Sequence, residues 1–218
     1  MRGLAWWAKN RGRFCRLPLK AQNQVRQPVW NLAQCPAGAH LAFRTNATAF
    51  GVRVRNSTAE HMNHMASTGS NGLMLYGGGP GQQRPWSVAR PSPSEPKFDA
   101  LFFSGLEKKM REFRLYLPLY TPLLELDIGL SRGARLLAPT APVLQKPAVF
   151  YGTSITQGGC ASTAGSDYVS TVGRQLNLET VNLGFSGNGR GEPEMARLLA
   201  EIDASIYVID YAANVDAA

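Results

Sequence analysis

A serine that follows a short apolar stretch is the residue whose position first suggests chemistry. Residues 149–152 read Val-Phe-Tyr-Gly, and Ser154 stands two positions further on, ahead of a polar, glycine-rich segment. This order predicts a buried strand that ends in a tight turn, with Ser154 at the carboxyl end of the strand. Because ligands of open α/β sheets bind at the carboxyl ends of the strands, a hydroxyl group there is well placed to meet a substrate.

Three short motifs, each after a predicted strand, make this part of the chain resemble the SGNH (GDSL-type) hydrolases. Residues 152–156, Gly-Thr-Ser-Ile-Thr, resemble the first block of the family, which is usually written Gly-Asp-Ser. Residues 182–189, Asn-Leu-Gly-Phe-Ser-Gly-Asn-Gly, resemble its glycine block. Residues 210–214, Asp-Tyr-Ala-Ala-Asn, resemble its asparagine block. The resemblance covers the chain from about residue 148 onward.

The resemblance implies a serine ester hydrolase with Ser154 as the nucleophile. In the family this serine attacks an ester or acyl carbonyl, and fixed donors stabilise the oxygen that becomes negative. Carried over, those donors are the backbone N–H groups of Ser154 and Gly187 and the side-chain amide of Asn214. Gly189 is the alternative to Gly187, and Thr153 in place of the usual aspartate changes a supporting contact. If the family resemblance is set aside, Ser154 and Gly187 are interpreted as turn residues and Asn214 as a helix-cap residue.

The general base of the family has no counterpart in the sequence. A serine hydroxyl is a poor nucleophile until a neighbouring histidine takes its proton. In SGNH hydrolases that histidine belongs to an Asp-x-x-His block near the carboxyl end of the domain. The three histidines here, His40, His61 and His64, all precede the first motif. We therefore expect a truncated sequence that keeps the nucleophile and the oxyanion donors but is catalytically silent by itself.

The residues before the first motif predict a β-sandwich of the jelly-roll type. Short runs with strand character are separated by turn-forming glycines and prolines, and no long helical pattern interrupts them. The runs are residues 29–32, 41–44, 50–55, 72–76, 101–103, 112–117 and 123–130. This half resembles the β-sandwich with a Gly-x-Asp-Leu-Tyr signature that precedes the catalytic domain in one branch of SGNH hydrolases. Met74 stands where that signature has aspartate.

Strands and helices alternate after residue 148, which predicts a doubly wound α/β domain. Apolar residues at helical spacing predict one helix over 168–176, capped by Ser166 or Asp167, and a second over 195–202. The predicted strands are residues 148–151, 179–183 and 205–211. The fold class is therefore α/β: an N-terminal β-sandwich followed by an incomplete three-layer α/β/α, flavodoxin-like SGNH domain.

Four parts are expected in chain order. A poorly ordered basic lead-in covers residues 1–24, the β-sandwich accessory domain 25–131, a proline-rich linker 132–147, and the first part of the hydrolase domain 148–218. The family resemblance implies that the first strand of this domain lies between the second and the third. The third strand would then be an open apolar edge, which is a template for pairing with another chain. We therefore expect self-association through this edge.

Charge and cysteine usage argue against several other functions. The net charge is +8, but the basic residues are scattered and no nucleic-acid module accompanies them, so we expect no nucleic-acid partner. Cys15, Cys35 and Cys160 have no paired spacing, which argues against a disulfide framework and a zinc site. Cys160 is interpreted as a small buried hydrophobe. His61-x-x-His64 lacks a third ligand in register, so we expect neither metal nor cofactor.

No apolar run approaches the roughly 20 residues that a membrane span needs, so no membrane partner is expected. The apolar stretch over residues 4–8 is shorter than a signal-peptide core of about 7–15 residues. The sequence as written reads as cytoplasmic, but relatives can be exported, and the localisation is left open.

Two functions are compatible with these patterns. The first is a serine ester hydrolase or deacylase that acts on acylated carbohydrate or another small ester. The attached β-sandwich is what hints at a sugar. The alternative is a non-catalytic carbohydrate-binding β-sandwich with a remnant hydrolase domain.

Overall fold

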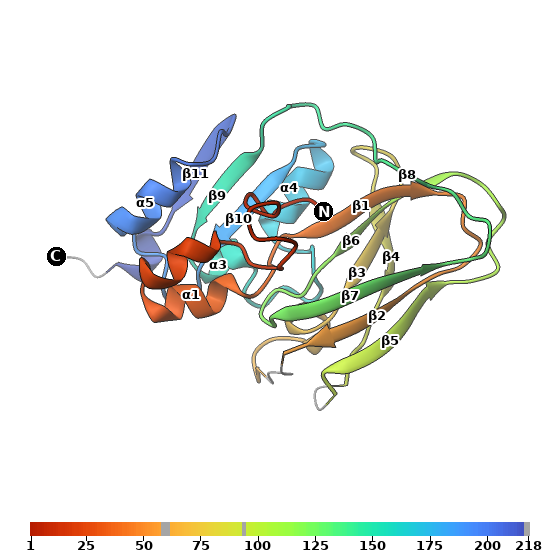
Figure 1. Cartoon of the computed structure of the whole chain (residues 1–218), viewed down its shortest axis with the longest axis horizontal. Coiled ribbons are helices and arrows are strands. Elements are labelled where there is room, and N and C mark those ends of the chain that lie inside the picture. The colour runs from red at the N-terminus through yellow and green to blue at the C-terminus, as the bar shows by residue number, and fades with distance from the viewer. Residues whose placement is uncertain (58–61, 93–94, 216–218) are drawn as a thin grey trace.

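The computed structural model describes residues 1–57, 62–92 and 95–215. A β-sandwich fills one side of the molecule, and a smaller parallel sheet with helices fills the other (Figure 1). This arrangement confirms the α/β class with an N-terminal β-sandwich, whereas the domain boundaries stay predictions.

Two antiparallel sheets form the sandwich, with strand orders β4-β3-β6-β1-β8 and β5-β2-β7. A core of aromatic and aliphatic side chains fills the space between them. Strand β2 shows the alternation behind this packing, because Val52 and Val54 are buried while Arg53 is exposed. The strands are β1 His40–Thr45, β2 Phe50–Asn56, β3 Met74–Gly77, β4 Arg84–Val88, β5 Lys97–Phe103, β6 Arg111–Tyr116, β7 Leu123–Leu130 and β8 Leu136–Leu137. Strands β4 and β8 are not among those predicted from the sequence.

The smaller sheet is parallel and has the order β10-β9-β11, with β9 Ala148–Gly152, β10 Thr180–Gly184 and β11 Ile206–Asp210. This confirms the expected place of the first strand between the second and the third. Its helices are α3 Ser154–Gln157, α4 Tyr168–Gln175, α5 Pro193–Leu199 and the 3₁₀ turn η2 Ala212–Asn214. Of the two expected caps, Asp167 is the one used, because its carboxylate accepts the N–H of Ser170 at 2.9 Å.

Strand β11 differs from the doubly covered strand that its apolar sequence suggests. Ile206, Tyr207 and Ile209 are 44–51% exposed. Within the described residues, β11 pairs with β9 alone. The apolar sequence is that of a covered strand, but the cover is not among the described residues.

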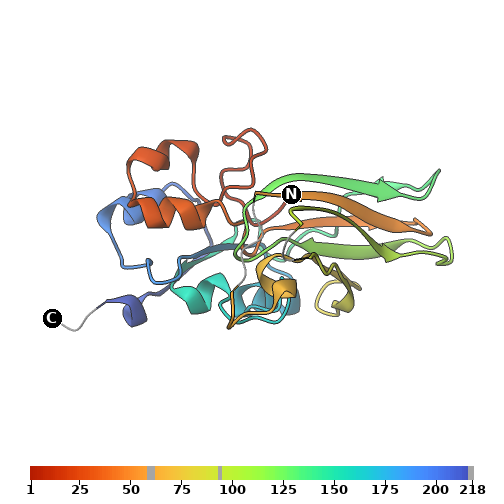
Figure 2. The same cartoon turned by 90° about the horizontal axis from the view of Figure 1, so that it is seen from below.

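The amino-terminal segment is packed, which corrects the expectation of a poorly ordered lead-in over 1–24. Leu4 lies in the sandwich core, while Trp6, Cys15 and Leu17 lie in the core against the parallel sheet. Asn10 holds this irregular segment, because its amide donates to the carbonyls of residues 15 and 17. In Figure 2 the segment (red to orange) and α4 (blue) lie on opposite sides of the parallel sheet. The sequence of this segment has no apolar periodicity that would predict its structure, because side-chain hydrogen bonds rather than a regular helix or strand hold it.

The run 29–32 is helical, so its assignment to a strand is wrong. It lies in α1, Gln27–Ala33, with Pro28 in the first turn, and Val29, Trp30 and Ala33 are buried. That spacing marks one face of a helix, which a four-residue apolar run cannot reveal. The other short helices are η1 Leu19–Asn23 and α2 Ser67–Ser70.

Arg16 joins the amino-terminal segment to the parallel sheet. Its side chain is buried and donates to four backbone carbonyls, those of Leu32, Cys35, Asn182 and Gly184, at 2.6–3.2 Å. Two of these carbonyls lie on the outer edge of β10, where no strand follows among the described residues. Burial lowers the pKa of Arg16 to about 10, which leaves the guanidinium charged at neutral pH. A buried cation therefore takes the place of a neighbouring strand.

We expect Arg16→Met to destabilise the fold by roughly 3–5 kcal/mol, because the carbonyls that lose their donor stay buried and each costs about 1–3 kcal/mol. Urea unfolding measures the change. The matched control is Arg13→Met, an exposed arginine of the same segment, which should change the stability by less than about 0.5 kcal/mol. Equal stability of the two variants would contradict this role.

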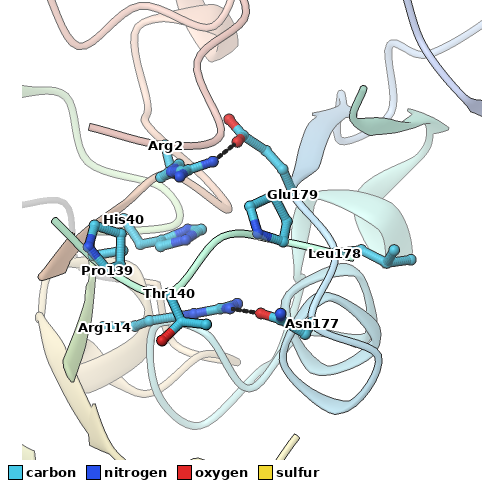
Figure 3. A pocket seen from close by; sticks show the side chains of 10 residues that line it. Arg2, His40, Arg114, Pro139, Thr140, Asn177, Leu178 and Glu179 are labelled. Carbon is cyan, nitrogen blue, oxygen red and sulfur yellow. Dashed lines mark hydrogen bonds and ion pairs between the residues drawn. The ribbon is translucent and has the colours of Figure 1, made fainter. Parts of the chain in front are cut away.

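His40 lies at the seam between the two halves, far from Ser154. Arg2 is ion-paired with Glu179 on one side of it, and on the other Arg114 donates to Asn177 at 3.0 Å (Figure 3). Glu179 precedes β10, so the seam is at the amino end of the parallel sheet. At about 3.3 Å per residue, the five residues of β10 put it more than about 13 Å from the carboxyl end.

Acid should destabilise the protein through His40. Burial, and then repulsion from Arg114, lowers its pKa from 6.5 to about 3. Between these values the unfolded chain binds a proton that the folded chain does not, so stability falls by up to roughly 1.4 kcal/mol per pH unit as the pH drops. Urea unfolding at pH 7 and pH 4.5 measures this slope. His40→Gln should flatten it, and an unchanged slope would assign the effect to other groups.

Candidate active site

Ser154 lies at the carboxyl end of β9, as the sequence predicts. The strand ends at Gly152, Thr153 caps the next helix, and Ser154 is the first residue of α3. Thr153 Oγ1 accepts the N–H of Ile155 at 3.3 Å, which fixes the turn. Thr153 is buried, whereas Ser154 is partly exposed. The structure therefore presents the serine at the sheet's edge on a buried support.

The glycine block packs directly against the end of β9. The N–H of Phe185 donates to the carbonyl of Gly152 at 2.9 Å. A Cβ on Gly189 would lie only 2.0 Å from the same carbonyl oxygen, so only glycine fits there. The N–H of Gly189 is also occupied, since it donates to the carbonyl of Phe185 at 2.8 Å. Gly189 is therefore a packing glycine.

Gly187 differs from Gly189 in both respects. Its φ of 66° is in the left-handed region, and a Cβ on it would meet no atom within 4 Å. Its N–H makes no hydrogen bond to the rest of the described chain. An open glycine with a free donor is what an oxyanion hole needs. The geometry favours Gly187 over its alternative, and its role stays a prediction.

Gln157 connects the serine block to the glycine block and to the sandwich. Its side chain is fully buried. Its Oε1 accepts the N–H of Ser186 at 3.0 Å, and its Nε2 donates to the carbonyl of Leu119 at 3.2 Å. The sequence motifs do not single out this residue. A polar residue on the buried side of a predicted turn is the one available signal.

Asn214 joins the asparagine block to the glycine block. Its Nδ2 lies 3.1 Å from the carbonyl oxygen of Gly189 and 3.4 Å from that of Phe185. The second distance is long for an N–H···O bond. The three motifs therefore converge at one end of the sheet, with Asn214 held by backbone carbonyls.

Neither described histidine approaches Ser154 as a hydrogen-bond partner. His40 is at the seam, and His64 is exposed with its ring nitrogen 3.1 Å from Asn63 Oδ1. His61 lies outside the described residues. Cys160 is exposed, so its interpretation as a buried hydrophobe is wrong. It occupies a surface turn with φ 63° rather than the inward side of a helix.

No group of three or more His, Cys, Asp or Glu side chains able to hold a metal ion occurs among the described residues. In the same part of the chain, every helix is too short or too polar to cross a bilayer.

Two family models match the chain. One, described as the N-terminus of SGNH-hydrolase-type esterases and named for its GxDLY signature, matches residues 1–136. The other, the GDSL-like lipase/acylhydrolase family, matches residues 145–218. Together they confirm the resemblance stated from the motifs. No curated protein is similar enough to count as a match.

Solved structures have the same fold. A protein from Bacteroides ovatus described as a GDSL-like lipase is 29% identical with a TM-score of 0.84, over 91% of this chain and 58% of that chain. A salicylyl-acyltransferase from a tetracycline biosynthetic pathway is 19% identical with a TM-score of 0.69, and the match covers 92% of this chain and 55% of that chain. A family two carbohydrate esterase from Clostridium thermocellum is 16% identical with a TM-score of 0.54, and the match covers 82% of this chain and 60% of that chain. The last two show the fold alone, and the chain spans 55–60% of each of these three chains.

The two glycines should respond differently to an added methyl group. Gly189→Ala forces a Cβ into a backbone carbonyl, so we expect a loss of about 3 kcal/mol or more. Gly187→Ala meets no atom and should cost only the left-handed strain, about 1–2 kcal/mol. Urea unfolding compares the variants. Equal losses would mean that Gly189 does not pack as described.

Proposed function

The chain belongs to the SGNH-hydrolase-type esterases with a GxDLY N-terminus, and from this membership we propose that the protein is a serine ester hydrolase with Ser154 as its nucleophile. The observation that carries the proposal is the convergence of three motifs at one end of the parallel sheet. The partly exposed Ser154 follows β9, the open N–H of Gly187 follows β10, and Asn214 follows β11.

In the proposed reaction, Ser154 Oγ attacks the carbonyl carbon of the ester while its proton passes to a general base. The carbonyl π electrons move to oxygen, and the N–H groups of Gly187 and Ser154 stabilise that oxyanion. The Asn214 amide is the third donor, through the N–H whose contact with Phe185 is long. Collapse expels the alcohol, which takes up the proton, and water then hydrolyses the acyl-enzyme.

The general base is the part of this scheme that the described residues do not supply. The chain spans 58% of the Bacteroides protein. We place the base in the portion of the hydrolase domain that this comparison leaves uncovered. Without a base, a factor of roughly 10²–10⁴ in rate is lost. Residues 1–218 alone should therefore have almost no esterase activity.

Acylated carbohydrates or other small esters are the proposed substrates. Support comes from the carbohydrate esterase that has the same fold. The salicylyl-acyltransferase shows that the fold also serves acyl transfer. The step proposed for Ser154, attack on an acyl carbonyl, suits either kind of acyl chemistry.

A carbohydrate-binding module without catalysis is less well supported. The sandwich does not stand apart, because Arg114, Tyr116 and Leu119 of its strands and loops bond to residues 157–177. One hollow on its outer β5-β2-β7 face is lined largely by charged side chains, among them the Arg53–Asp99 ion pair, and a neighbouring hollow is lined mainly by glycine and aliphatic residues. Affinity that survives removal of residues 148–218 is therefore not expected.

Self-association of residues 1–218 stays a prediction. Among the described residues, β11 pairs on one side only and exposes apolar side chains, and uncovered edge strands pair with other chains.

In the full-length protein, Ser154→Ala should lower the hydrolysis of p-nitrophenyl acetate by roughly 10³-fold or more, because the nucleophile is removed. The matched control is Ser162→Ala, an exposed serine in the following loop, which should leave the rate unchanged. The same assay on residues 1–218 tests whether they have almost no esterase activity. Full activity of Ser154→Ala would remove this serine from the mechanism.

A further inference from the structure

Arg26, the residue directly before α1, bonds to the glycine block from the amino-terminal side of the chain. Its Nη1 donates to Asn188 Oδ1 and its Nη2 donates to the backbone carbonyl of Asn188, both at 2.9 Å. Its Nε donates to Glu192 Oε1 at 2.8 Å, and the two side chains form an ion pair. The planar fork of arginine suits acceptors in such fixed positions. An arginine whose side chain is 39% exposed thus holds the loop that follows β10.

The side-chain amide of Asn188 is bonded at both ends. Its Oδ1 accepts from Arg26, and its Nδ2 donates to the carbonyl of Ser186 at 2.9 Å. A guanidinium can only donate hydrogen bonds, so it holds the amide with its oxygen toward Arg26 and its nitrogen toward Ser186. The reversed amide would set donor against donor and acceptor against acceptor. Arg26 therefore selects the orientation of the Asn188 side chain.

The carbonyl that Asn188 binds belongs to the same peptide group as the N–H of Gly187. This peptide is trans, and a trans peptide is planar with its C=O and N–H pointing in opposite directions. A hydrogen bond that fixes the Ser186 carbonyl therefore also fixes the direction of the Gly187 N–H. That N–H has no protein partner among the described residues. The bond also polarises it, because linked hydrogen bonds strengthen one another.

We propose that Arg26 is a positioning residue of the active site, which holds Asn188 and, through it, the direction of the Gly187 N–H. The amino-terminal segment then supplies part of the catalytic apparatus. This inference rests on the proposed function, because the direction of this N–H matters only if an oxyanion forms beside Ser154. A misdirected donor weakens binding of the transition state while the neutral ester still binds, so kcat and kcat/KM fall together and KM does not change.

The test uses the full-length protein and p-nitrophenyl acetate. Arg26→Met removes the donors and keeps the length of the side chain, which makes no capping bond to α1. We expect kcat to fall about 10-fold with KM changed less than about twofold, since a displaced catalytic group loses rate steeply. The matched control is Lys20→Met, which breaks an exposed ion pair of the same segment with Glu201, between α5 and β11. Its kcat should stay within about twofold of wild type. Thermal unfolding checks that both variants are folded.

A double-mutant cycle with Asn188→Ala decides whether Arg26 acts through Asn188. Asn188→Ala should itself lower kcat about 10- to 100-fold, because it frees the peptide directly. If Arg26 acts through Asn188, the double variant loses little more than Asn188→Ala alone; independent, additive losses would overturn the proposal. A wild-type kcat for Arg26→Met, or an equal loss for Lys20→Met, would also overturn it.

Ser154→Ala is assayed alongside to separate the two proposals. If that variant keeps its activity, the proposed function fails. If it is inactive while Arg26→Met has the wild-type kcat, only this inference fails.

Discussion

A buried guanidinium without a carboxylate partner in the described chain organises much of this molecule. Arg16 bonds to carbonyls of α1, of the turn after it and of β10, and it stacks on Phe185 with 4.7 Å between the guanidinium carbon and the ring centroid. Desolvating a cation is costly, and it is tolerated here because four charge-assisted hydrogen bonds replace the lost water. The edge of β10 and the start of the glycine block depend on this one side chain.

The candidate site is braced from three separate parts of the chain. Arg16, in the amino-terminal segment, bonds to the end of β10. From the sandwich, Leu119 accepts a hydrogen bond from Gln157, and the Tyr120 hydroxyl lies beside Gly159. Tyr151 holds the residues directly after the glycine block, because its hydroxyl accepts the N–H groups of Arg190 and Gly191. The glycine loop is positioned by its surroundings, which suits a donor that must be fixed before charge develops.

Local patterns predicted what depends on local sequence. Ser154 after a strand, a helix cap at Ser166 or Asp167, and most strands were foreseeable because the apolar period and the turn residues specify them. Contacts between distant segments were not, because neither Arg16 nor Gln157 carries a sequence signal for its partners. The helix over 27–33 was missed since a short apolar run has no readable period. Motif resemblance named the site residues, but which glycine is open and which is packed required coordinates.

The contact between Arg16 and β10 also constrains the order of assembly. Arg16 and Gly184 are separated by 168 residues in sequence. Contacts of such long range form late, because the chain entropy of closing a large loop must be overcome first. On the ribosome, residues 1–37 emerge long before the strand that completes their bonds. Side chains such as Trp6 and Leu17, which pack against the parallel sheet, stay largely unburied until β10 has been synthesised. In such an interval nascent chains aggregate or bind chaperones.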